Sequence, residues 1–222
     1  MYNKHKLISK KNNNESPRRS KVSKTNNDEE NAEEDTMDEL VTVKDNHIYY
    51  YSDVDTKSIL LLLKYIRELN LKLLSLKTEL DYKYDTSMEL YIYLHINSGG
   101  GYILDALAAV DYIKKSKIPI ISIVDGFAAS AATFLSMVCY KRQITTSSTM
   151  LIHQLSSSAS GTFQQIDDDH INNKYLQNKI KKIYIENSNG KLTDKLLDNL
   201  LKHDIMWDAQ KCKSNGIVDE IV

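Results

Sequence analysis

Three residues of the types that together hydrolyse acyl bonds are spread over the second half of the chain: Ser130, His153 and Asp204. Ser130 lies in the segment AASAA (residues 128–132), where small neighbours let a substrate approach the main chain closely. A serine nucleophile needs a base within hydrogen-bond reach, and the base needs an acid that holds its tautomer. If the fold brings the three together, the chemistry they predict is nucleophilic acyl transfer.

Each of these residues, taken singly, also has an ordinary structural explanation. A serine among alanines is more often a helix-packing residue, and a histidine at the end of an apolar strand is usually a structural one. Asp204 lies where a loop or cap carboxylate would, and Asp208 is well placed to cap a short helix that follows it. The segment around Ser130 is not the G-x-S-x-G turn of α/β-hydrolases. The signal is therefore specific only as a set.

The elements that must position these residues follow the pattern of an α/β domain. Residues 89–97 and 119–125 predict two buried strands, each followed by glycine and then by a helical pattern. Two successive strand–turn–helix units place both turns at the same carboxyl edge of a sheet. Ser130 is expected just after the second turn, at the start of its helix.

Further elements are expected on both sides of these two units. A strand over 149–154 carries His153 at its end, and a helix over 193–202 precedes Asp204. The other expected elements are a strand over 47–51, a helix over 58–80 with a break near Asn70, a helix over 164–184, and a last helix and strand ending at Val222.

Composition divides the chain into two parts. Residues 1–38 are rich in Asn, Lys, Ser, Glu and Asp, with almost no apolar side chains to bury, and they predict a disordered polar arm. Residues 39–222 are expected to form one domain. This start has no apolar run typical of a secretory signal, so a cytoplasmic location is expected, with organelle targeting as the lesser alternative.

Charge and cysteine content exclude several classes of function. Lys plus Arg number 29 against 30 Asp plus Glu, so no overall field favours nucleic acid or a membrane surface. The longest apolar run, residues 118–140, is interrupted by Asp125 and by small residues, which argues against a membrane span. Cys139 and Cys212 lack the spacing of a zinc site or a disulfide framework. No metal site is predicted.

Four motifs, in order, resemble those of the Clp-type serine peptidases. That family shows I-N-S-P-G-G, then G-x-A-A-S-M, then M-I-H-Q-P, and finally R-D-x-x-x-S-A-x-E-A-x-x-x-G-(L/I)-(V/I)-D. This chain has INSGGG (96–101), GFAASA (126–131), MLIHQL (150–155) and HDIMWDAQKCKSNGIVD (203–219). The resemblance covers nearly all of residues 89–222, and its specificity comes from the order of the four motifs.

The resemblance implies a ClpP/crotonase-like α/β fold of stacked ββα units, and roles for individual residues. Ser130 matches the nucleophile, His153 the base and Asp204 the residue that orients the imidazole. The implied oxyanion hole is the backbone N–H of Gly101 and Ala131, and the implied substrate-lining residues are Gly100 and Gly161, the latter in a strand just before the helix over 164–184. The chemistry requires neither a metal nor an organic cofactor.

The resemblance also implies partners. The substrates would be peptides and unfolded proteins, and subunits would close into homo-oligomeric rings, as a heptamer or a double heptamer, fed by a Clp-type ATPase unfoldase. The helix over 164–184 would pack between rings through its apolar positions, which are Ile166, Leu176, Ile180 and Ile183. Two alternatives stay open: a crotonase-like enzyme that binds acyl-thioesters, and a catalytically quiet ring or scaffold subunit.

Two prolines of the family motifs are replaced in this chain. Gly99 stands in the S-P-G-G position, and Leu155 stands after His-Gln. Both positions border the edges against which an extended substrate would pair. The replacements therefore predict differently shaped substrate edges around an intact Ser-His-Asp set.

Overall fold

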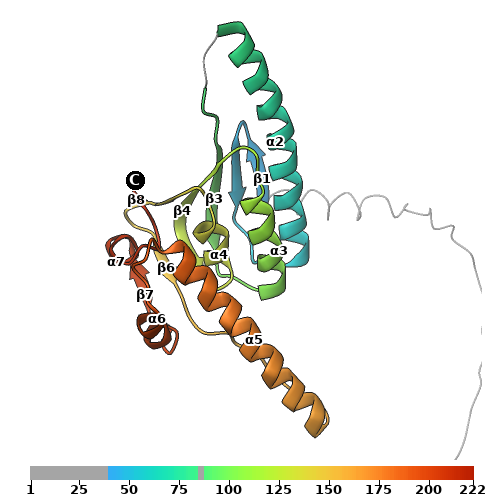
Figure 1. The fold of residues 1–222 in the computed structure, drawn as a ribbon, viewed down its shortest axis with the longest axis vertical. Helices are drawn as coiled ribbons and strands as arrows, with labels where there is room; N and C mark the ends of the chain where they lie inside the picture. The colour runs from blue at the N-terminus through green and yellow to red at the C-terminus, as the bar shows by residue number, and fades with distance from the viewer. Residues whose placement is uncertain (1–39, 85–87) are drawn as a thin grey trace, which may run out of the picture.

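A computed structural model describes residues 40–84 and 88–222 of the chain (Figure 1). The expected disordered arm over residues 1–38 lies outside the described residues. The strands are β1 (Val41–Lys44), β2 (His47–Tyr50), β3 (Ile92–Ser98), β4 (Ile120–Ala129), β5 (Lys141–Ile144), β6 (Thr149–Leu151), β7 (Met206–Asp208) and β8 (Glu220–Ile221). The helices are α2 (Thr56–Tyr84), α3 (Ile103–Lys114), α4 (Ala132–Met137), α5 (Phe163–Asn187), α6 (Asp194–Leu200) and α7 (Ala209–Ser214).

The strands form one mixed sheet, in which β1 to β5 and then β8 are neighbours in the order β1-β2-β3-β4-β5-β8. β2, β3, β4 and β5 run parallel, as the strand–turn–helix pattern predicts, and β1 closes the edge as an antiparallel strand. β6 pairs in parallel with the end of β4 and antiparallel with β7. The α/β class expected from the sequence is confirmed.

β4 is longer than its sequence predicts. The expected strand stops at Asp125, yet β4 continues through Gly126 to Ala129. Gly126 adopts φ +102° and donates its N–H to Ser148 Oγ, so the strand changes partner at this point instead of turning away from the sheet. Before Gly126 it pairs with β5, and after Gly126 it pairs with β6. The turn into the next helix therefore lies at Ser130.

α2 is unbroken, contrary to the interruption expected near Asn70. The Asn70 amide nitrogen donates to Ile66 O and Ser116 Oγ, and its oxygen accepts from the N–H groups of Lys117 and Ile118. A side chain that would compete with the helix instead links it to the loop before β4. The helix therefore runs straight through this position.

The helices extend from the sheet in two opposite directions (Figure 1). α2 and α3 pack beside each other, and the end of α2 projects beyond one end of the sheet. α5 contacts α4 and projects beyond the other end. Of the apolar positions expected to lie exposed on α5, Ile180 and Ile183 are in fact buried, at 3% and 8% exposure, and belong to the chain's own core.

One hydrophobic core runs from β1 to the C-terminal segment. Its largest fully buried side chains include Leu62 of α2, Leu94 of β3 and Leu135 of α4. The core therefore joins the sheet, α2 and α4, the short helix after Ser130, into one body.

No helix among the described residues has both the length and the apolar character needed to span a membrane.

Candidate active site

Ser130 occupies the turn between β4 and α4 in a conformation that few residues adopt. Its φ is +52°, in the left-handed region that costs a residue with a Cβ of the order of 1 kcal/mol. Its N–H donates to Leu151 O at 2.8 Å, and its carbonyl accepts from Thr133 Oγ1 at 2.6 Å. These contacts hold the strained turn at the carboxyl edge of the sheet. Sequence reasoning placed Ser130 at this edge but gave no signal of the strain.

The Thr133 hydroxyl connects this turn to α5. Thr133 Oγ1 lies 2.5 Å from Tyr184 OH, and the ring of Tyr184 lies 5.2 Å from that of Phe134. Burial raises the pKa of Tyr184 far above its usual range, so the phenol remains neutral and can donate. Because Thr133 donates to Ser130 O, Tyr184 donates to Thr133. A buried chain of hydrogen bonds from Tyr184 through Thr133 therefore supports the Ser130 turn.

The glycine turn after β3 lies directly against the Ser130 turn. Gly100 has φ +95°, and a Cβ there would lie 2.6 Å from Ala129 O and 2.8 Å from Ser130 Cβ. Gly101 has φ +150°, and its Cβ would collide with Val54 O. Only glycine fits both positions, because Gly100 lies against the Ser130 turn and Gly101 lies against the main chain at Val54. Gly101 and Ala131, the two residues expected to donate their N–H groups, line one pocket.

His153 follows β6 and faces Asp204 across a short gap. His153 Nδ1 lies 3.7 Å from Asp204 Oδ1, an ion-pair distance rather than a hydrogen bond. The His153 side chain is 22% exposed, whereas that of Asp204 is 77% exposed. Gln154 N–H donates to Leu201 O at 3.1 Å and so joins the two loops. The structure thus places the expected base and acid together, with the acid in solvent.

Asp208, four residues after Asp204, caps a helix. Its carboxylate accepts from Lys211 N–H at 2.8 Å and caps α7, as its position in the sequence predicted.

Both cysteines are free and buried, and burial raises the pKa of Cys139 and that of Cys212 to about 12. Neither thiol is therefore a thiolate nucleophile at neutral pH. Within residues 40–84 and 88–222, no cluster of three or more His, Cys, Asp or Glu side chains could hold a metal ion.

One pocket of about 190 Å³ brings most of the expected site residues together. Ser130, Ala131, His153 and Gly101 all line it. Among the described residues no hydrogen bond joins Ser130 to the His153 ring, a looseness that catalytic pairs often show before substrate binds. The remaining lining residues are Tyr102, Ile103, Phe134, Gln154, Leu155, Ser156 and Ile180.

Sequence reasoning did not name the apolar wall of this pocket. Tyr102 directly follows Gly101, and Phe134 lies one helical turn after Ser130, so local spacing could have found both. Ile180 lies far along α5 and carries no local signal. The pocket is therefore lined by both polar and apolar residues.

Gly161 does not lie in this pocket. The strand expected around it is absent, because residues 152–162 form neither strand nor helix. Gly161 has φ +143°, and a Cβ there would collide with the Gln165 side chain. Gln165 and Thr162 form the capping box that begins α5. The glycine is therefore explained by the start of the helix.

Comparison with known proteins gives the family. The family model for Clp protease matches residues 31–222, and the chain belongs to this family. A protein of Streptococcus mutans described as an ATP-dependent Clp protease proteolytic subunit is 36% identical over 135 residues, which cover 59% of this chain and 68% of the relative. Subunits with the same description from Streptococcus sanguinis and Lactococcus lactis are 33% and 32% identical over the same length, covering 59% of this chain and 68% and 67% of the relatives.

Proposed function

We propose that this chain is a serine endopeptidase in which Ser130 is the nucleophile, His153 the general base and Asp204 the residue that orients the imidazole. The observation that carries the proposal is the shared pocket: the strained Ser130 turn, His153 and the Gly101–Ala131 pair all face one cavity. Membership of the Clp protease family supports it independently.

In the proposed reaction, Ser130 Oγ attacks the substrate carbonyl carbon while its proton passes to His153. The N–H groups of Gly101 and Ala131 donate to the carbonyl oxygen as it becomes negative. The peptide C–N bond then breaks, and the departing amine takes the proton from His153. A water molecule, deprotonated by His153, hydrolyses the acyl-enzyme and restores the serine. The carboxylate of Asp204 stabilises the imidazolium formed in both halves.

The finer proposal concerns assembly and partners. We place the chain in a homo-oligomeric ring, as a heptamer or double heptamer in the cytoplasm, that takes peptides directly and unfolded proteins from an ATP-dependent unfoldase. The relatives' description as subunits of an ATP-dependent protease supports this. The exposed apolar side chains of α5 support it also; these are Phe163, Ile166, Ile171 and Tyr175. Size-exclusion chromatography with light scattering should give a particle mass of several hundred kilodaltons. An active monomer near 25 kDa would contradict the ring.

A fluorophosphonate probe tests the nucleophile. The probe should label the wild-type protein at Ser130, as mapped by peptide mass spectrometry. The Ser130→Ala variant should lose labelling and lose hydrolysis of a fluorogenic peptide by about 10⁴-fold or more, because only the attacking oxygen is removed. Unchanged turnover in this variant would contradict the assignment. The two alternatives, an acyl-thioester enzyme and a quiet subunit, predict no labelled serine.

A further inference from the structure

The main chain that carries His153 has already left the sheet. β6 ends at Leu151, and the following residues up to 162 form neither helix nor strand. Just after His153, Gln154 N–H donates to Leu201 O at 3.1 Å and Leu155 N–H donates to Gln177 Oε1 at 2.7 Å. The second bond is the direct link between the main chain beside the base and α5.

The same face of α5 also borders the pocket. Gln177 is half-buried, and Ile180, one turn later, is 3% exposed and lines the same pocket as Ser130 and His153. Leu155 also lines this pocket, and its N–H donates to Gln177. α5 therefore supplies both a wall of the pocket and an acceptor for the loop that carries the base.

We propose that Gln177 is a positioning residue for His153, acting through the Leu155 N–H, and this rests on the proposed peptidase function. Proline has no N–H, so the bond exists only because residue 155 differs from the proline of the M-I-H-Q-P motif. The Leu155 replacement and Gln177 thus form a functional pair. The side-chain amide fixes the main chain two residues after the base, where no strand does so.

The expected effect is on the chemical step. His153 accepts a proton only as the transition state forms, so a displaced imidazole lowers kcat more than it raises KM. A merely structural contact would instead lower thermal stability and leave the kinetics of the folded protein unchanged. Separating kcat from KM therefore distinguishes the two roles.

The test replaces the acceptor in the assembled full-length protein. Gln177→Met keeps side-chain length and helix propensity but cannot accept the bond, and kcat for a fluorogenic peptide should fall about three- to tenfold with KM unchanged within about twofold. Gln177→Glu keeps an acceptor oxygen and should recover about half or more of the wild-type kcat. Asn173→Ala is the matched control, because Asn173 lies one turn earlier on α5 and binds Ser157 Oγ of the same loop at 2.7 Å. This control should retain the wild-type kcat.

A double-mutant cycle tests the pair itself. Leu155→Pro removes the donor, and adding Gln177→Met to it should cause no further loss, because both changes remove one bond. Additive losses, a wild-type kcat in Gln177→Met, or equal losses of kcat and melting temperature in Gln177→Met and Asn173→Ala would each overturn the positioning role. An active Ser130→Ala variant would overturn the peptidase function as well. An inactive Ser130→Ala beside a normal Gln177→Met would overturn the positioning role alone.

Discussion

The two halves of the candidate site are built in different ways. The nucleophile side (Gly100, Gly101, Ser130 and Ala131) lies where β3 and β4 end, and close backbone contacts fix its turns. The base side (His153 and Asp204) lies on two irregular loops, with a 3.7 Å gap between the side chains and the acid 77% exposed. The proposed oxyanion half is therefore fixed by the sheet, whereas the proposed proton-transfer half lies on loops that bind α5 and the C-terminal segment.

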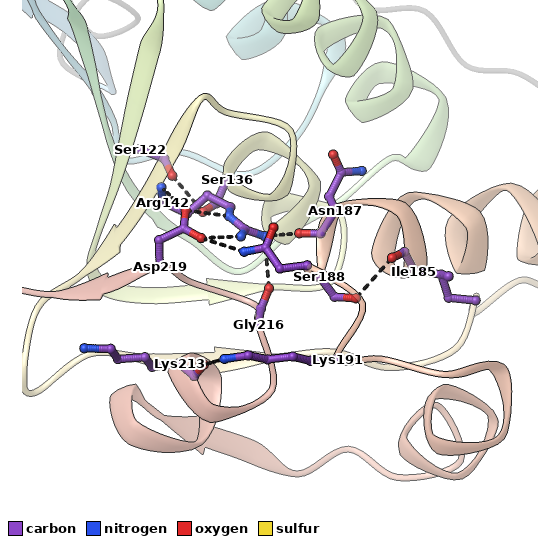
Figure 2. A network of polar contacts seen from close by, with 11 residues as sticks. Ser122, Ser136, Arg142, Ile185, Asn187, Ser188, Lys191, Lys213, Gly216 and Asp219 are labelled. Carbon is purple, nitrogen blue, oxygen red and sulfur yellow. Dashed lines mark hydrogen bonds and ion pairs between the residues drawn. The ribbon is translucent and has the colours of Figure 1, made fainter.

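A buried ion pair attaches those supports to the sheet. Arg142 of β5 pairs with Asp219 at 2.5 Å and also donates to the carbonyls of Asn187, at the end of α5, and Gly216 (Figure 2). Its side chain is 5% exposed, and that of Asp219 is 28% exposed. One guanidinium thus joins β5, the end of α5 and the segment before β8. This Arg142–Asp219 clamp therefore holds the end of α5, the helix that also carries Gln177.

Removing the clamp should give the largest effect on stability. Arg142→Met leaves Asp219 partly buried without its charged partner and should lower the free energy of unfolding by about 3 kcal/mol, the low end for buried pairs because Asp219 keeps some solvent contact and the Asn189 hydrogen bond. Chemical denaturation measures this. The matched control is Lys141→Met, which breaks the exposed pair between Lys141, next to Arg142 on β5, and Glu220 of β8, and should cost far less stability. Equal losses would show that the clamp is ordinary surface charge.

The clamp also predicts a pH dependence. Burial alone would raise the pKa of Asp219, but the hydrogen bonds and charge of Arg142 outweigh it and hold that pKa below its usual range. A carboxyl with a depressed folded pKa contributes stability above its unfolded pKa of about 3.9 and loses it as pH falls through the folded value. The wild type should therefore lose this stability below about pH 4. Arg142→Met removes the guanidinium charge but leaves the donors at the backbone N–H of residue 142 and at Asn189. The pKa of Asp219 should therefore be depressed less in the variant, and the difference in stability between the two proteins should shrink on acidification.

Gly101→Ala should break the nucleophile side. The new Cβ would collide with Val54 O at a φ that residues with a Cβ rarely adopt, so the turn must move and carry its N–H away from the pocket. Loss of one oxyanion donor should lower kcat about 10²- to 10³-fold. Gly190→Ala is the control, because Gly190 has φ +74° but no atom within 4 Å of the new Cβ. That variant should lose some stability and keep its kcat.

Asp204→Asn should have a smaller effect, which sharpens the contrast between the two sides. The acid is exposed and 3.7 Å from His153, so solvent weakens its hold on the imidazole, and kcat should fall about 10²-fold, the low end for a triad acid. Asp208→Asn is the control, because asparagine caps α7 as well as aspartate does. If Asp208→Asn costs more activity than Asp204→Asn, the acid is wrongly assigned.

The contrast also explains what the sequence could predict. β3, its glycine turn and the region of Ser130 follow from local patterns, because apolar runs and glycines report directly on buried strands and tight turns. The extension of β4 through Gly126 could not be predicted from the sequence, because a glycine looks the same there whether the chain turns or the strand changes partner. Gln177 binds the loop that carries His153, and Ile180 lines the pocket, only because α5, which is distant in the sequence, packs there. His153 and Asp204 were predicted from the family resemblance. No local pattern in the sequence predicts the 3.7 Å between their side chains.

The smallest effect concerns residues 1–38, whose composition offers too little apolar surface to offset the entropy of ordering them. Deleting them should change the free energy of unfolding by less than about 1 kcal/mol and leave kcat for a small peptide unchanged, because every proposed site residue lies later in the sequence, at or after Gly100. Denaturation and peptide hydrolysis of the truncated chain measure both. A large fall in stability would mean that the segment packs on the domain. A fall in kcat with normal stability would mean that it reaches the pocket and contributes to one of the two sides.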